Sequence, residues 1–249
     1  MTSTAHPVPK QIVLHQPGGR PWGMPNMGPF CIKLETYLRM AGWGYEWQRS
    51  DFRRAPKGKI PYVSLDGELV GDSQLIMERL ERSRAAAGQP TMDAWLDDRH
   101  RAVGHAVQRM LDEATYFALL HLRWTDDIGW ETYRPALAKS LGPIKVALPL
   151  IRRSINKRQQ MQGTGRHDAS DIEDMAIADL TSLAAIIGDN AFLLGERPST
   201  YDSSAFASIE ATLGFPVMSR TRKFALDNAV LRGYRERMRA KWWGDLKAG

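Results

Sequence analysis

Residues 55–73 read APKGKIPYVSLDGELVGDS, and this stretch decides the fold that the sequence predicts. Asp66-Gly67 is the dipeptide of a type I′ turn, so the apolar runs on either side of it should pair as an antiparallel hairpin. Asp72 and Ser73 are good N-cap residues, and the apolar residues Leu75, Ile76 and Leu80 recur after them at helical spacing. A helix is therefore expected to begin there, with free backbone N–H groups at a tip that can hold a carboxylate.

The residues before the hairpin supply the rest of a small α/β unit. An unbroken apolar run at 11–15 predicts a buried strand, and the breaker-rich segment 16–28 predicts a long loop. An apolar stripe predicts a helix that starts at Pro29 and ends at Gly42. A second strand is expected at 45–49, followed by a poorly formed connection at 51–57. The order β-α-β-loop-β-β-α is that of a thioredoxin-like domain, and the expected N-terminal architecture is βαβαββα.

Beyond a linker at 85–90 the sequence shows helical periodicity and no strand pattern. Helices are expected at 92–124, at 133–162 with breaks near Gly142-Pro143 and Pro149, at 170–187, from about 199, and at 219–243. Two capping boxes, Ser170 to Glu173 and Ser199 to Asp202, mark two of the helix starts. The predicted fold class is therefore α+β, with a thioredoxin-like domain at 1–86 and an all-helical domain at 91–249.

Composition excludes several classes of protein. The 249 residues are 43% hydrophobic and 25% charged, which is typical of a globular chain. The N-terminus has no apolar segment of signal-peptide length and no run is long enough to span a bilayer, so a cytoplasmic location is expected. The single cysteine, Cys31, excludes an internal disulfide, and the six histidines form no metal-ligand pair, so no metal is expected.

Positive charge gathers in one part of the helical half. No acidic residue lies between Glu131 and Asp168, whereas eight residues there are basic: Arg134, Lys139, Lys145, Arg152, Arg153, Lys157, Arg158 and Arg166. This basic stretch 134–166 is either a solvated helical face or a site for an anionic partner or membrane surface. The net charge of +6 is diffuse enough to be explained by solubility alone, and no nucleic-acid partner is expected.

Four motifs, taken together in this order, resemble one protein family. They are residues 28–42 with the sequence GPFCIKLETYLRMAG, residues 56–62 with PKGKIPY, residues 162–167 with QGTGRH, and residues 192–202 with FLLGERPSTYD. This set is similar to the glutathione S-transferase-like superfamily, in the branch that contains metaxin and the Failed-axon-connections proteins. The resemblance extends from about Gln11 to Leu213.

The resemblance implies a glutathione site on the stretch quoted first. Pro61 would be a cis-proline that exposes the Ile60 backbone to the cysteinyl part of glutathione, as an added strand pairs with a sheet edge. Asp72 and Ser73 match the acidic-Ser pair that holds the γ-glutamyl end. Ser73 and the helix tip suit its α-carboxylate, and Asp72 suits its α-ammonium. Lys59 would face the glycyl carboxylate, unless it is merely solvated.

The thiol-activating residue is the part of the family pattern that this sequence lacks. The family uses Tyr, Ser or Cys near the start of the first helix, and Gly28 occupies that position here. Cys31 is interpreted as a buried core residue rather than the nucleophile. The helix-tip amides and the side chains of Asn26 and Trp22 are the candidates that remain.

Two functions from different classes are therefore open. The first is a glutathione S-transferase-like enzyme, expected to be a homodimer, which uses the glutathione thiol to conjugate or reduce small hydrophobic electrophiles. Aromatic residues are the candidates for its electrophile pocket, or else belong to the core: Trp22, Tyr116, Phe117, Trp124 and Trp130. The second is a non-catalytic, metaxin-like interaction protein that uses its basic helical half.

Overall fold

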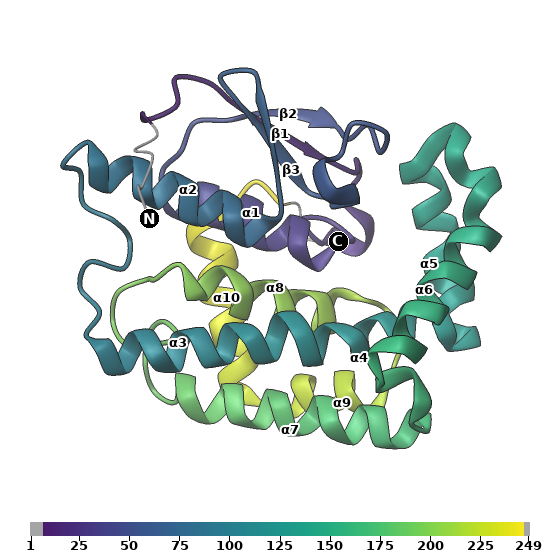
Figure 1. Ribbon diagram of the computed structural model, residues 1–249. Helices are drawn as coiled ribbons and strands as arrows, with labels where there is room; N and C mark the ends of the chain where they lie inside the picture. The colour runs from purple at the N-terminus through teal and green to yellow at the C-terminus, as the bar shows by residue number, and fades with distance from the viewer. Residues whose placement is uncertain (1–6, 247–249) are drawn as a thin grey trace.

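A four-stranded sheet forms the N-terminal part of the chain. The structure, a computed structural model, describes residues 7–246 (Figure 1). The strands are β1 Ile12–Gln16, β2 Glu46–Arg49, β3 Tyr62–Leu65 and β4 Glu68–Gly71, and their order in the sheet is β2-β1-β3-β4. β1 is parallel to β2 and antiparallel to β3, and β3 and β4 form the expected antiparallel hairpin. The thioredoxin-like prediction for this part of the chain is confirmed.

Two helices, α1 Pro29–Met40 and α2 Ser73–Ala86, lie between the sheet and the rest of the molecule (Figure 1). Leu14 of β1 pairs with Val63 of β3, and both are fully buried against apolar side chains of α1 and α2. The helix expected between the second and third strands of a βαβαββα domain is not formed, and only the 3-10 turn Pro56–Gly58 lies between β2 and β3. Leu75 departs from the predicted apolar set, since it is 40% exposed on the outer face of α2.

The C-terminal part is helical, as predicted. Its helices are α3 Asp98–Met110, α4 Tyr116–Leu120, α5 Asp127–Leu141, α6 Leu148–Gln162, α7 Ala169–Ile187, α8 Tyr201–Gly214, α9 Arg220–Asp227 and α10 Ala229–Trp242. α8 contributes fully buried residues such as Phe206 and Ile209 to the helical core and packs on α1. α5 and α6 stand to one side of this core and rise beside the N-terminal part (Figure 1).

Several predicted helix limits are wrong. The helix expected from residue 92 begins at Asp98, because the Asp97 carboxylate caps it by accepting from the His100 N–H at 2.7 Å. Two π-helical turns, Leu111–Thr115 and His121–Thr125, interrupt its continuation. The next helix starts at Asp127 rather than 133, where the carboxylate of Asp126 caps it.

Tertiary contacts explain the other differences. The capping box at Ser170 does not form, because α7 starts at Ala169 and Glu173 accepts instead from the Thr221 N–H at 2.8 Å. The helix expected at 219–243 is two helices, since the side chain of Asn228 caps α10 by accepting from the Leu231 N–H. Met175, predicted on the buried face of α7, is 42% exposed.

Neither a membrane span nor a metal cluster is found in the part of the chain that the structure describes. Within residues 7–246, no helix is both long and apolar enough to cross a bilayer. Three or more His, Cys, Asp or Glu side chains also do not gather there in a way that could hold a metal ion.

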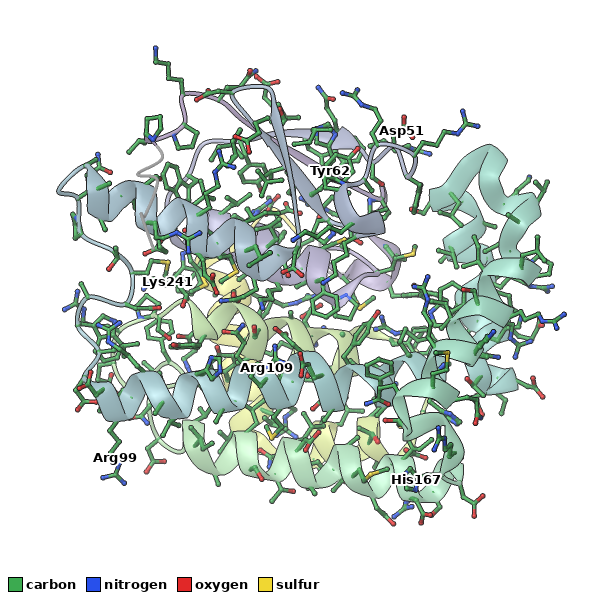
Figure 2. The ribbon with its side chains drawn as sticks, in the orientation of Figure 1. Asp51, Tyr62, Arg99, Arg109, His167 and Lys241 are labelled. Atoms are coloured by element: carbon green, nitrogen blue, oxygen red, sulfur yellow. The ribbon has the colours of Figure 1, made fainter. Side chains whose placement is uncertain are left out.

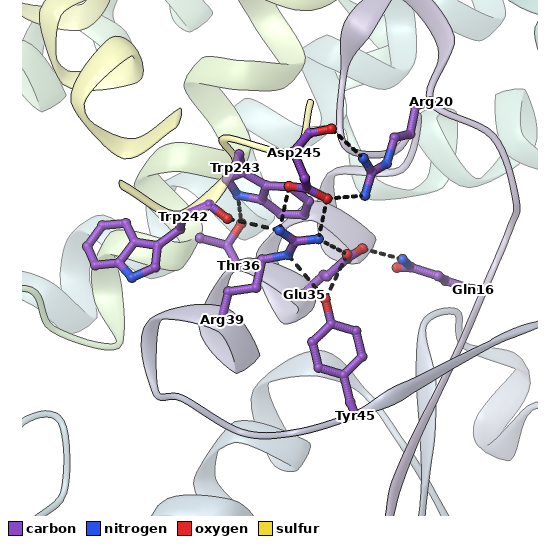
Figure 3. Close-up of polar contacts among 9 residues, drawn as sticks. All are labelled: Gln16, Arg20, Glu35, Thr36, Arg39, Tyr45, Trp242, Trp243 and Asp245. Carbon is purple, nitrogen blue, oxygen red and sulfur yellow. Dashed lines mark hydrogen bonds and ion pairs between the residues drawn. The ribbon is translucent and has the colours of Figure 1, made fainter. Parts of the chain in front are cut away.

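A polar cluster, here called the C-terminal clasp, joins α1 to the end of the chain (Figure 3). Arg39 of α1 donates to the Asp245 carboxylate at 2.7 Å and to Glu35 at 3.1 Å, and its guanidinium lies 3.9 Å from the centre of the Trp243 ring. Arg20, from the loop between β1 and α1, donates to the second Asp245 oxygen at 2.9 Å. These contacts hold the loop 17–28 and α1 against the helical part.

Candidate functional site

The segment that leads into β3 has a backbone held from two sides. The Ile60–Pro61 peptide bond is cis. The hydroxyl of Tyr62 accepts from the Asp51 N–H at 3.1 Å and donates to the Asp51 carbonyl at 3.2 Å. Figure 2 labels both residues. At the end of β4, a Cβ on Gly71 would lie 2.7 Å from the Pro56 carbonyl oxygen, so only glycine fits there. The Ile60 backbone is therefore fixed beside the tip of α2.

The tip of α2 brings together the predicted residues Lys59, Asp72 and Ser73. Asp72 has a φ of 81°, and its Oδ1 accepts from the N–H groups of Gln74 at 3.1 Å and Leu75 at 3.3 Å. Its Oδ2 accepts from the Lys59 ammonium, so Lys59 and Asp72 form an ion pair. Ser73 is buried at the first helical position. Burial would raise the pKa of the Asp72 carboxyl, but the hydrogen bonds from Lys59 and the two amides hold it below the ordinary value.

The start of α1 offers no side chain at the expected position of the thiol activator. Gly28 is the N-cap of α1, with an extended backbone and no side-chain cap. Asn26 is 2% exposed; its amide donates to the Pro17 carbonyl at 2.9 Å and its oxygen accepts from the Gly28 N–H at 3.1 Å. Asn26 therefore shapes the loop. Cys31 is buried, and this burial, with the nearby Glu35, raises the pKa of its thiol. The interpretation of Cys31 as a core residue agrees with this placement.

A cavity of about 240 Å³ opens next to Gly28 and is lined from both parts of the molecule. Gly28, Cys31 and Ile60 belong to its N-terminal side, and Tyr116 and Trp124 to its helical side. The remaining lining is mostly apolar: Pro17, Met27, Pro29, Phe52, Leu119, Leu120, Arg123, Tyr133, Leu137, Leu141, Ile151 and Ile155. A small apolar molecule placed in this cavity would be enclosed close to the N-terminus of α1.

The other predicted pocket aromatics lie outside this cavity. Trp22 packs against Tyr133 and Phe215, with ring centres 6.5 and 5.3 Å away. Phe117 is also absent from the lining, although its ring meets that of Tyr116 edge-on at 5.5 Å. Trp130 faces a separate groove. The structure thus brings two of the five predicted aromatics to the cavity.

Sequence reasoning missed Arg123, the one charged residue among those described as lining the cavity. Its side chain is 2% exposed; Nη1 donates to the Met27 carbonyl at 2.7 Å and Nη2 to the Ala211 carbonyl at 2.8 Å. Burial lowers the pKa of the guanidinium, although an arginine stays charged in any folded protein. In the sequence Arg123 is an ordinary basic residue in a helical pattern, and nothing in its neighbourhood marks it as buried.

The basic stretch lines a second hollow, here called the α5–α6 groove. This open groove of about 670 Å³ is bordered by Trp130, Arg134, Lys145, Val146, Leu148, Pro149, Arg152, Arg153 and Asn156. Arg152 is tied to the protein, because its Nε donates to the Trp124 carbonyl at 2.7 Å. Val146 and the nearby Leu150 are 82% and 73% exposed. Basic and apolar side chains therefore share this surface.

Comparison with known proteins finds similarity to glutathione transferases in both sequence and fold. The family model described as the glutathione S-transferase N-terminal domain matches residues 29–129. An isoprene-epoxide glutathione S-transferase of Rhodococcus sp. (strain AD45) is 29% identical over 230 residues, which cover 89% of this chain and 95% of that protein. The solved β-etherase LigF of Sphingobium sp. strain SYK-6 superposes with a TM-score of 0.64 at 16% identity, over 92% of this chain and 95% of the other.

The metaxin-like branch is found as well. Failed axon connections of Drosophila melanogaster is 28% identical over 197 residues, or 74% of this chain and 46% of that protein. Metaxin-1 of Homo sapiens is 26% identical over 204 residues, or 77% of this chain and 42% of that protein. The chain spans about half the length of these two relatives.

Proposed function

We propose that this chain, a member of the glutathione S-transferase-like superfamily, is a glutathione transferase that conjugates or reduces small hydrophobic electrophiles. One observation carries the proposal: a largely apolar cavity lies where the Ile60 backbone, the start of α1 and the helical part meet. A transferase needs this juxtaposition, because the thiol and the electrophile must meet in a space that excludes water.

Glutathione would lie along the segment before β3, with its cysteinyl backbone pairing with Ile60. Its γ-glutamyl carboxylate would meet Ser73 and the N-terminal amides of α2, while its ammonium would approach Asp72. The Lys59 ammonium already contacts Asp72, so the ligand ammonium would share or replace that ion pair. In either arrangement the cysteinyl side chain points from Ile60 toward the cavity that Ile60 lines.

The proposed conjugation is a nucleophilic substitution by sulfur, or the opening of an epoxide ring by sulfur. The thiol gives its proton to water, and the sulfur forms a bond to the electrophilic carbon as the bond to the leaving group breaks. The leaving group departs with that electron pair; in an epoxide the oxygen stays attached and takes a proton from water. The largely apolar lining favours a hydrophobic electrophile. The isoprene-epoxide transferase, matched over nearly its whole length, supports this assignment.

Ser73→Ala tests the glutathione side. Removing the hydroxyl should weaken glutathione binding by about 1–3 kcal/mol, the cost of stranding a charged acceptor, which is roughly 5- to 150-fold in Kd. Calorimetry would measure Kd, and turnover with a chlorinated aromatic electrophile would follow activity. Ser170→Ala, at an exposed start of α7, is the matched control and should change neither. An unchanged Kd for Ser73→Ala would place the site elsewhere.

A second candidate function rests on the α5–α6 groove. The matches to Failed axon connections and metaxin-1, together with the exposed basic and apolar side chains of the groove, support a non-catalytic interaction protein. The two functions give opposite results on immobilised glutathione. Retention on the column together with turnover supports the enzyme. If the protein shows no retention and no turnover, the interaction protein is the function that remains.

A further inference from the structure

Arg123 is a buried cation with no counter-ion among residues 7–246. Its only hydrogen bonds in that range go to the Met27 and Ala211 carbonyls, and its Nε has no partner. The ring centres of Phe215 and Tyr133 lie 5.2 and 5.7 Å from its guanidinium carbon. Carbonyl dipoles and aromatic faces stabilise a guanidinium, but they do not neutralise its charge.

The other titratable groups facing the cavity leave that charge uncompensated. Tyr116 and Tyr133 interact electrostatically with Arg123, and Cys31 acts on both tyrosines. Two further charges act on these groups, Arg158 on Tyr116 and Glu35 on Cys31, but neither acts on Arg123. Burial raises the pKa of Tyr116 to about 12 and also raises the pKa values of Tyr133 and Cys31, so all three stay neutral at physiological pH. An anion that enters the cavity would therefore meet a single positive charge in apolar surroundings, where the attraction is strong.

Arg123 also lies close to the place where a thiol activator is missing. It donates to the carbonyl of Met27, the residue before Gly28, and it lines the same cavity as Gly28 and Ile60. Gly28 has no side chain, the Asn26 side chain is occupied by Pro17 and Gly28, and the partly buried Trp22 packs against Phe215 outside the cavity. Among these candidates, only Arg123 brings a positive charge to the cavity wall, and its Nε is a buried donor without a partner.

We infer that Arg123 is a catalytic residue that holds the glutathione sulfur as a thiolate, in place of the hydroxyl or thiol that the first helix lacks. This inference rests on the proposed function for the identity of the thiol. The S–H proton leaves to water, and the sulfur keeps its electron pair next to the guanidinium, which neither gains nor loses a proton. An opposite charge within about 4–6 Å shifts the titration of an acid downward by about one to three pH units.

The test titrates bound glutathione by the ultraviolet absorbance of its thiolate, in a Cys31→Ser background that removes the protein's own thiol. In that background, Arg123→Met should raise the titration midpoint of the bound glutathione thiol by about one pH unit or more. Arg123→Lys should bring the midpoint part of the way back. Arg222→Met is the matched control, because Arg222 also donates to a carbonyl of α8, that of Leu213, but does not line the cavity. An equal midpoint with and without Arg123 would overturn the inference.

A second probe separates this inference from the proposed function. Thiophenolate and its neutral analogue toluene both fit an apolar cavity, and only thiophenolate can use the charge. Arg123→Met should weaken thiophenolate binding about tenfold or more while leaving toluene binding nearly unchanged, as measured by calorimetry. If glutathione fails to bind but this difference persists, the proposed function fails and the anion site stands. If the difference is absent, the anion site fails, whatever glutathione does. Arg123→Gln, which keeps an amide donor, replaces Arg123→Met should that variant not fold.

Discussion

Two consecutive residues of α8, Glu210 and Ala211, belong to two sites that each contain a buried charge. The charge in the first site is paired with opposite charges, and the charge in the second is not. The Glu210 carboxylate is fully buried and accepts from Arg235 at 2.7 Å and from Arg239 at 2.5 Å. The carbonyl of Ala211 accepts from Arg123, which has no carboxylate partner among the described residues. Each site also contacts the loop 17–28, since Arg239 donates to the Gly23 carbonyl and Arg123 donates to the Met27 carbonyl.

The difference separates charges that hold the fold together from a charge that is available to a ligand. A buried ion pair with complete partners joins two helices and leaves little field outside itself. A buried cation without a counter-ion costs free energy in the folded protein, and a bound anion would recover it. The Glu210 cluster is therefore interpreted as structural and Arg123 as functional.

Glu210→Gln would test this comparison with the largest expected effect. The substitution leaves two partly buried arginines without their carboxylate and should lower the free energy of unfolding by about 3–5 kcal/mol. Arg123→Met should cost less than about 2 kcal/mol, because losing two hydrogen bonds is offset by removing an unpaired buried charge. Urea unfolding measures both. A larger loss for Arg123→Met would mean that Arg123 is mainly structural.

The sequence predicts the N-terminal part well, because its signals are local. Asp66-Gly67 determines a turn, and Asp72 caps the helix that follows it, so the hairpin and the α2 tip can be predicted from a few neighbouring residues. The helical part is harder to predict, because its helix ends depend on distant partners. Glu173 bonds to Thr221 instead of closing a capping box, and no local pattern predicts this contact.

The candidate site also has one part that local sequence predicts and one part that depends on distant contacts. The Lys59, Asp72 and Ser73 cluster follows from one continuous stretch, and the structure brings these residues together. The cavity needs residues that are far apart in sequence, such as Gly28, Ile60 and Arg123, and their proximity depends on how α1 packs against α8. Burial of Arg123 is a tertiary property, which its charge and helical spacing do not predict.

Gly28→Ser would sharpen the comparison by giving the cavity the hydroxyl that it lacks. A Cβ at Gly28 would lie 3.2 Å from the Cys31 sulfur and 3.7 Å from the Asn26 oxygen, and the backbone there has an ordinary φ of −91°. A small shift of Cys31 therefore accommodates serine. In an Arg123→Met background, Gly28→Ser should raise kcat/KM by about fivefold, the worth of one hydrogen bond to the sulfur.

Gly28→Ala controls for the added Cβ and should give no such gain. With Arg123 present, Gly28→Ser should raise kcat/KM less than in the Arg123→Met background, because the thiol is then already ionised at neutral pH. Equal gains in the two backgrounds would mean that Arg123 and the hydroxyl act on different steps.

The C-terminal clasp gives the smallest expected effect, because its charges are paired and partly exposed to water. Hydrogen bonds from Arg39 lower the pKa of Asp245 to about 2, although burial opposes this shift, and the hydrogen bond from Arg20 adds to it. Because the pKa in the folded state lies below the unfolded value of about 4, the stabilisation is complete above about pH 4. It is lost as the pH falls through about 2.

Asp245→Asn should therefore lower the free energy of unfolding at about pH 6 by about 1 kcal/mol or less, since a side chain that is 48% exposed is well screened by solvent. The difference from the unsubstituted protein should shrink at about pH 3, where part of the Asp245 population is protonated in both states. Urea midpoints at the two pH values measure it, with the exposed Asp189→Asn as the control. A loss several times larger that persists at low pH would show that Asp245 acts through packing rather than through its charge. The clasp would then resemble the Glu210 cluster in its effect on stability.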